Sequence, residues 1–295
     1  MINKEQPIFR AETSPKKEPD ERYLSRIKKE IIKIKRQYKD PIEFNKKYIE
    51  LKDHLIKEHP EEALTIEVLF GLKDYAEAQT ELISWRIKKE KIDPENIKRT
   101  MRSLTEWQFA ATYLLIQVGQ NKKFSGPFWT EGGILNNLFT KQKFRGTKKG
   151  IIGQVGVYRL LEHFGLKPKL AHPDEDAFEK TDLLVSYPES NRLMAIQTKY
   201  TTRTEKPILM SSDEISYPSI AHYGKKKNIH ISNKDIYEMM RLKESCQDRS
   251  KRDGKNTLGL YLSCPIGSFD SLSGEPTKEF LTQIEPEIKK YFYDN

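Results

Sequence analysis

The sequence predicts an α/β region from about residue 150 onward, preceded by an all-helical region, and three observations support this division. First, an apolar residue recurs every three or four positions after residue 23, the stripe typical of an amphipathic helix. Its members are Leu24, Ile27, Ile31 and Ile34. Second, no apolar–polar alternation typical of a strand follows before residue 121. Third, TDLLVSY (181–187) and RLMAIQTKY (192–200) predict two β-strands joined by a tight turn in PESN.

The N-terminal part is predicted to be a disordered tail followed by a helical domain. Residues 1–20 are rich in Lys, Glu, Pro and Ser and show no apolar period, so they cannot bury enough apolar surface to fold. Prolines then precede each further helical pattern, and we expect one helical domain over 21–120. The expected helices after the first are 42–58, 61–90 and 95–119. These patterns predict no chemistry.

Residues 121–150 interrupt the helical pattern with Gly and Pro, and we predict a basic linker there. Its basic residues are interleaved with Phe139 and Phe144. They are Lys141, Lys143, Arg145, Lys148 and Lys149. Such a mixture can bind phosphates and stack on nucleic-acid bases, and it also suits a solvated linker that is anchored by aromatic side chains.

After residue 150 the predicted order of elements is helix, three strands, helix, strand, helix. The first helix is 151–164 and ends at Gly165, and KPKLAHP then predicts a short strand before an acidic loop, DEDAFEK. The stretch after 200 is predicted to be irregular to about Ile231. A helix then begins at Ser232, with Asp235 three residues on, and the strand TLGLYLSCP and the helix in EPTKEFLTQIEPEIKKYF follow.

Composition narrows the function classes. The chain has 295 residues with 52 basic and 43 acidic ones, and its net charge of +9 suits a polyanionic partner, although a lysine-rich composition alone gives the same value. No apolar run is long enough to cross a membrane, and the polar N-terminus lacks a secretory signal. Cys246 and Cys264 lie far apart, which is typical of a cytoplasmic protein without disulfides.

One group of residues predicts chemistry. Asp182 begins one strand, and Gln197 and Lys199 lie near the end of the next, where alternation puts both side chains on one face. An even-numbered connection between the strands would pair Asp182 with Gln197 or Lys199, whereas an odd one would place it opposite Thr198. A carboxylate suits Mg²⁺, and a neighbouring lysine can orient water or neutralise developing charge.

The helix 151–164, Asp182 in TDLLV and Gln197-Thr198-Lys199 in MAIQTKY together resemble the PD-(D/E)xK superfamily, the nuclease fold of many restriction, resolvase and repair enzymes. The resemblance covers at most residues 150–264. It implies a restriction-endonuclease-like core over 151–295, with a mixed central sheet flanked by helices. It also implies catalysis with Mg²⁺ or Mn²⁺.

Two departures from the family pattern affect the expected metal site. Gln197 stands where the second acid is usual, although active branches with glutamine exist. The preceding helix offers Gln154 at the position of its usual glutamate, and Glu162 is the alternative, roughly 12 Å farther along the helix axis. The acidic residues of the expected loop are either further ligands or surface charges. They are Glu175, Asp176 and Glu179.

The resemblance implies a Mg²⁺- or Mn²⁺-dependent endonuclease that acts on DNA, with RNA as the second choice. Asp182 and Gln197 would hold the metal ion, Lys199 would position the attacking water, and Gln154 or Glu162 would complete the site. The run Lys225, Lys226 and Lys227 is a further candidate for nucleic-acid contact, and the helical region could support a homodimer. The alternatives are an inactive nuclease fold that binds nucleic acid or protein, and a coincidental motif.

Overall fold

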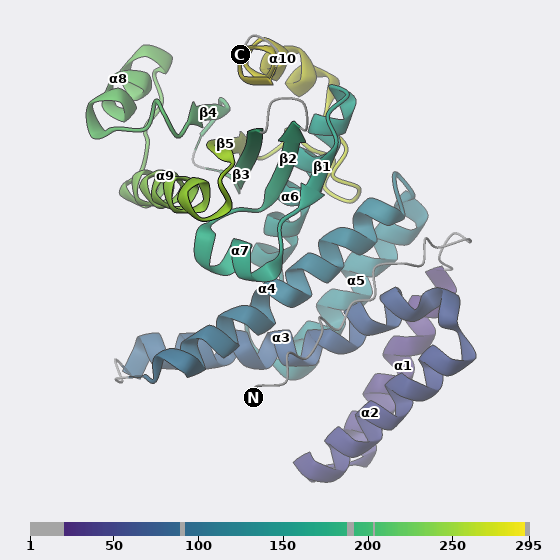
Figure 1. Cartoon of the computed structure of the whole chain (residues 1–295). Coiled ribbons are helices and arrows are strands. Elements are labelled where there is room, and N and C mark those ends of the chain that lie inside the picture. The colour runs from purple at the N-terminus through teal and green to yellow at the C-terminus, as the bar shows by residue number, and fades with distance from the viewer. Residues whose placement is uncertain (1–20, 89–91, 188–191, 203, 293–295) are drawn as a thin grey trace. The chain divides into compact units, whose positions relative to one another are not determined.

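The computed structural model describes residues 21–88, 92–187, 192–202 and 204–292 (Figure 1). The chain forms two compact units, which divide between Arg145 and Gly146. The tail expected over residues 1–20 and the turn expected in PESN lie outside the described residues.

The first unit is helical, as the sequence predicted. Its elements are α1 (Glu21–Gln37), α2 (Pro41–Glu58), the short 3-10 helix η1 (Pro60–Glu62), α3 (Ala63–Lys88), α4 (Pro94–Gln117) and α5 (Lys122–Phe139). The predicted apolar stripe of α1 is in the core, where Leu24, Ile27 and Ile31 are fully buried. The indole of Trp107 donates a hydrogen bond to the Val68 carbonyl at 2.8 Å, which ties α4 to α3.

The predicted basic linker over 121–150 is wrong, because most of it is helix. Asn121 caps α5 by accepting from the Phe124 amide, and the ring of Phe144 packs against the helix at Gly132. Phe144 is buried against the rings of Trp107 and Trp129, so this aromatic side chain belongs to the core and cannot stack on bases. Gly126, Gly132 and Gly133, which suggested a linker, lie inside α5.

The second unit contains the predicted elements and three more. Its elements are α6 (Arg145–His163), β1 (Pro168–Leu170), α7 (Pro173–Glu179), β2 (Leu183–Tyr187), β3 (Arg192–Thr201), β4 (Ile208–Ser211), α8 (Tyr217–Lys227), α9 (Asn233–Asp253), β5 (Asn256–Pro265) and α10 (Lys278–Phe292). The expected acidic loop is the helix α7, and the expected irregular stretch contains β4 and α8. As predicted, α9 follows Ser232, which caps it by accepting from the Asp235 amide.

The described strands form one mixed five-stranded sheet in the order β1-β2-β3-β5-β4. Strands β3 and β5 are parallel, and the other neighbouring pairs are antiparallel. A parallel pair needs a long crossover, which β4, α8 and α9 provide here. Helices α8 and α9 cover one face through a cluster that includes Ala195, Ile220 and Met239, while α6 packs on the other face (Figure 1).

Glycine lets α6 approach the sheet closely. A Cβ on Gly153 would stand 2.7 Å from the Cβ of Tyr200 on β3, and one on Gly156 would stand 2.4 Å from the ring of Phe269. Real Cβ atoms do not come so close, so a larger residue at either position would push the helix outward. This contact sets the position of Gln154, which neighbours Gly153 on α6.

We predict that Gly153→Ala lowers the free energy of unfolding by about 1–3 kcal/mol, the usual cost of overpacking. Gly150→Ala is the matched control, because it lies on the same helix with open space around its Cβ position. Alanine favours helix there, so this variant should be neutral or more stable by up to about 1 kcal/mol. Urea denaturation measures both, and equal effects would contradict the close contact.

Candidate active site

The register of β2 and β3 places Asp182 opposite Gln197. Leu183 pairs with Ile196, and the Asp182 amide donates to the Ile196 carbonyl at 2.8 Å. Of the two registers that the sequence left open, this is the one that an even-numbered connection gives. Asp182 and Gln197 therefore stand side by side at one edge of the strand pair.

Three donors converge on the Asp182 carboxylate, which is buried. The amide nitrogen Nε2 of Gln154 donates to Oδ1 at 2.8 Å, and Nε2 of Gln197 donates to Oδ2 at 2.7 Å. The backbone amide of Thr198 donates to Oδ2 as well. Between the alternatives on α6, the structure brings Gln154 to the site, whereas Glu162 is exposed two turns farther along the helix.

Lys199 joins this group, and a residue that the sequence did not reveal holds it. The Lys199 ammonium forms an ion pair with the buried Glu238 of α9, with an N–O distance of 3.0 Å. Burial disfavours the charged form of Lys199, but the negative charges of Asp182 and Glu238 outweigh it and raise the pKa of the ammonium. Lys199 therefore carries its positive charge at neutral pH.

The structure gives different environments to Glu175, Asp176 and Glu179 of α7, which the sequence could not distinguish. Glu175 forms an ion pair with Arg249 of α9 at 3.1 Å, and Glu179 forms ion pairs with both Arg249 and Arg252. Asp176 is partly buried and lies within hydrogen-bonding reach of the Asp182 carboxyl. Burial and repulsion from Asp182 raise the pKa of Asp176 to about 8, although Lys180 and Lys199 act in the opposite direction.

The oxygen atoms at this site suit a hard divalent cation. Among the described residues, no three His, Cys, Asp or Glu side chains are arranged to hold a metal ion together. Asp176 and Asp182 supply two carboxyl groups, however, and Oε1 of Gln197 is buried without a hydrogen-bond partner in the described part of the chain. Mg²⁺ is commonly held by one or two carboxylates that water and substrate phosphate supplement.

The basic residues proposed for nucleic-acid contact have different environments. Lys225 and Lys226 are exposed at the end of α8, but Lys227 forms an ion pair with Glu287 at 2.8 Å. The remaining ones divide between exposed residues of the first unit and half-buried residues of α6. They are Lys141, Lys143 and Arg145 in the former, and Lys148 and Lys149 in the latter.

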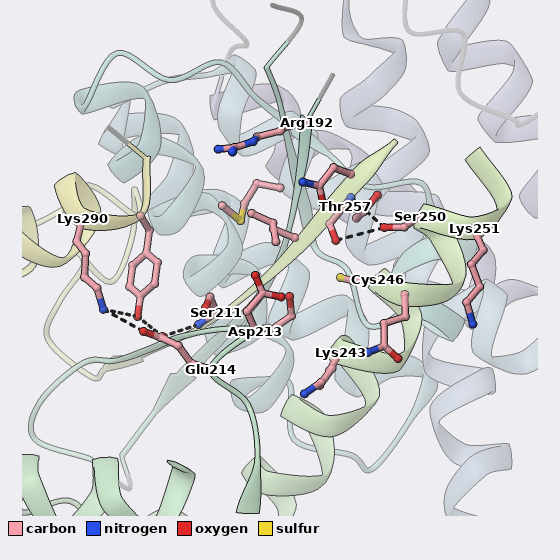
Figure 2. A pocket seen from close by; sticks show the side chains of 16 residues that line it. Arg192, Ser211, Asp213, Glu214, Lys243, Cys246, Ser250, Lys251, Thr257 and Lys290 are labelled. Atoms are coloured by element: carbon pink, nitrogen blue, oxygen red, sulfur yellow. Dashed lines mark hydrogen bonds and ion pairs between the residues drawn. The ribbon is translucent and has the colours of Figure 1, made fainter. Parts of the chain in front are cut away.

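An open cavity of about 910 Å³ lies elsewhere in the second unit, where β5 extends beyond β4 (Figure 2). Glu214 in its wall accepts from Lys290 at 3.0 Å, and the Ser250 hydroxyl accepts from the Thr257 amide at 3.0 Å. Burial raises the pKa of Cys246 to about 12, so its thiol stays protonated. These polar groups stabilise the cavity wall, and the group around Asp182 remains the better candidate site.

No protein-family model, curated protein or solved structure matches this chain. Within the described residues, no helix is long and apolar enough to cross a membrane. The arrangement of the residues around Asp182 is therefore the feature that indicates a function.

We predict that Asp176→Asn stabilises the protein in EDTA, and more so as the pH rises. The Asp176 carboxyl ionises near pH 3.8 in the unfolded chain but only near pH 8 in the folded one, so its contribution to stability declines between these values. Asparagine cannot ionise, and we expect a gain on the order of 1 kcal/mol at pH 8. Denaturant unfolding at pH 5 and pH 8 measures this difference.

Asp174→Asn is the control, since it removes the same charge from a more exposed position on α7. It is expected to bring no gain in stability. An Asp176→Asn variant that is less stable than the wild type at pH 8 would contradict the proposed repulsion between the two carboxyl groups.

Proposed function

We propose that this chain is a divalent-metal-dependent endonuclease with a restriction-endonuclease-like core, and that it hydrolyses phosphodiester bonds in DNA. The observation that carries the proposal is the convergence of Asp182, Gln197 and Lys199 from two paired strands, with Gln154 reaching them from the preceding helix. The PD-(D/E)xK pattern places the same kinds of residue in this order. The mixed sheet with helices on both faces agrees with such a core.

The roles of the residues follow from their contacts. Asp182 and Gln197 would hold Mg²⁺ or Mn²⁺, which supplies positive charge for the phosphodiester as its negative charge increases in the transition state. Lys199 would orient the attacking water and neutralise part of that charge. Glu238 forms an ion pair with the Lys199 ammonium and so keeps it near Asp182. Glu238 is therefore a positioning residue.

Nucleic acid is the proposed partner because the chain has a net charge of +9, and because lysines can neutralise phosphates. Lys225 and Lys226 are exposed and available for such contacts. DNA is the first choice and RNA the second.

Nicking of supercoiled plasmid with Mg²⁺ or Mn²⁺ tests the proposal. Asp182→Ala and Lys199→Ala are each expected to lower the rate at least about 100-fold, because each removes a charge that acts on the transition state. Asp174→Ala is the matched control, because it removes a carboxylate at a more exposed position of α7, and it should keep most of the activity. Metal-dependent nicking that persists in both site variants would contradict the proposed centre.

An inactive nuclease fold is the second candidate, and one observation favours it. Both carboxylate oxygens of Asp182 already accept hydrogen bonds from amide groups, as they would in a purely structural network. This candidate predicts that wild type, Asp182→Ala and Lys199→Ala bind DNA with equal affinity and that none of them cleaves it. Fluorescence anisotropy beside the nicking assay distinguishes the two functions.

A further inference from the structure

We propose that Asp176, delivered by α7, is the second carboxylate ligand of the divalent cation and replaces the acid that the chain lacks at Gln154 and Gln197. The inference rests on the proposed function, since it concerns the same metal site. Three features of the structure support it: the way α7 is held, the direction in which its acids point, and an unsatisfied oxygen beside Asp182.

Both ends of α7 are fixed by local hydrogen bonds. At the start, the His172 ring accepts from the Asp174 amide at 3.3 Å, and the Glu175 carboxylate accepts from the His172 amide at 2.7 Å. At the end, Lys180 adopts a left-handed backbone with φ 54°, and the Thr181 amide donates to the Glu175 carbonyl at 3.3 Å. Asp182 follows directly, so the helix leads into the site.

Ion pairs with α9 set the rotation of α7. Arg249 is almost fully buried, and a buried guanidinium is costly unless it is paired. Its partners are Glu175 and Glu179, and Arg252 adds a 3.0 Å ion pair to Glu179. With these two acids turned to α9, Asp176 is the acid of α7 that faces Asp182.

Asp176 faces the Asp182 carboxyl, so without a cation the two groups can lie together only if a proton is shared between them. A structural carboxylate usually accepts from an amide or a cation, whereas Asp176 faces another acid, and the nearby positive charges are those of Lys180 and Lys199. Two ionised carboxylates within hydrogen-bonding reach repel each other unless a cation lies between them. A divalent ion would turn the repulsion into shared attraction.

The side chain of Gln197 gives evidence for a cation that is independent of Asp176. Gln197 is 3% exposed, and its amide nitrogen donates to Asp182. Because Oε1 belongs to the same amide group, it also lies near the Asp182 carboxylate. That oxygen has no hydrogen-bond partner among the described residues. A buried carbonyl without a partner is costly, and a cation would satisfy it. Two carboxylates and an amide oxygen form the all-oxygen set that Mg²⁺ and Mn²⁺ prefer.

Mn²⁺ binding to the full chain, followed by electron paramagnetic resonance and by the metal-dependent rise in melting temperature, tests the inference without any activity assay. Wild type and Asp174→Asn are expected to bind Mn²⁺ and to melt at a higher temperature with it. Asp176→Asn and Asp182→Asn should each weaken binding at least about 10-fold, because each removes one charged ligand. Circular dichroism in EDTA confirms that each variant is folded.

A second variant tests whether the site requires a second carboxylate. Gln197→Glu in the Asp176→Asn background adds an acid next to Asp182 and is expected to restore Mn²⁺ affinity to within about 3-fold of wild type, since ligand charge sets affinity. Failure of this double variant to bind better than Asp176→Asn would count against the inference.

The outcomes separate the inference from the proposed function. Mn²⁺ affinity that falls in Asp182→Asn and is unchanged in Asp176→Asn would overturn the role of Asp176 and leave the nuclease centre in place. A wild type that binds no Mn²⁺, or binds it equally well without Asp182, would overturn both.

Discussion

The hydrogen bonds that converge on the Asp182 carboxylate organise the second unit. A buried carboxylate is costly unless donors surround it, and here they come from the α6 side chain Gln154 and from Gln197 and the Thr198 amide on β3. One acid thereby connects the helix before the sheet, the start of β2 and the middle of β3. Any shift in strand register or in the position of α6 would break at least one of these bonds.

The surrounding elements are built so that these donors stay in place. Gly153 lets α6 approach β3 closely enough for its neighbour Gln154 to reach Asp182. On the other face, α9 provides Glu238 for Lys199 and Arg249 for the acids of α7. The same helix therefore positions the ammonium and anchors the short helix that carries Asp176. In the sequence these charged residues are typical of a solvent-exposed surface, but in the structure their ion pairs stabilise the candidate site.

Much of the fold could be predicted because its signals are periodic. The apolar stripe of α1, the two strands around PESN, and the capped start of α9 all follow from local patterns, and the structure contains them. The elements that were missed are short or ambiguous. Strand β4 has four residues and α7 has seven, too few to show a clear period, and α5 was hidden because its glycines and Pro127 resemble a linker.

The candidate site was predictable on the two paired strands and, for Gln154, at the helix position that the PD-(D/E)xK resemblance names. Asp182, Gln197 and Lys199 were found from alternation and register, which act over short distances. Asp176 and Glu238 come from separate helices, and only the tertiary fold brings Asp176 to Asp182 and Glu238 to Lys199. A weak signal existed for Glu238, since it lies among the apolar residues that form the buried side of α9. Such an acid needs a buried partner, but the sequence does not name Lys199.

The central claim is that Asp182 is the centre of an oxygen-lined site for a divalent cation. The most direct measurement is the anomalous scattering of Mn²⁺ in crystals of the full chain. We expect a single strong peak within coordination distance of the Asp182 and Asp176 carboxylates and of Oε1 of Gln197. Crystals that show no peak there at saturating Mn²⁺, with both glutamine amides still donating to Asp182, would contradict the claim.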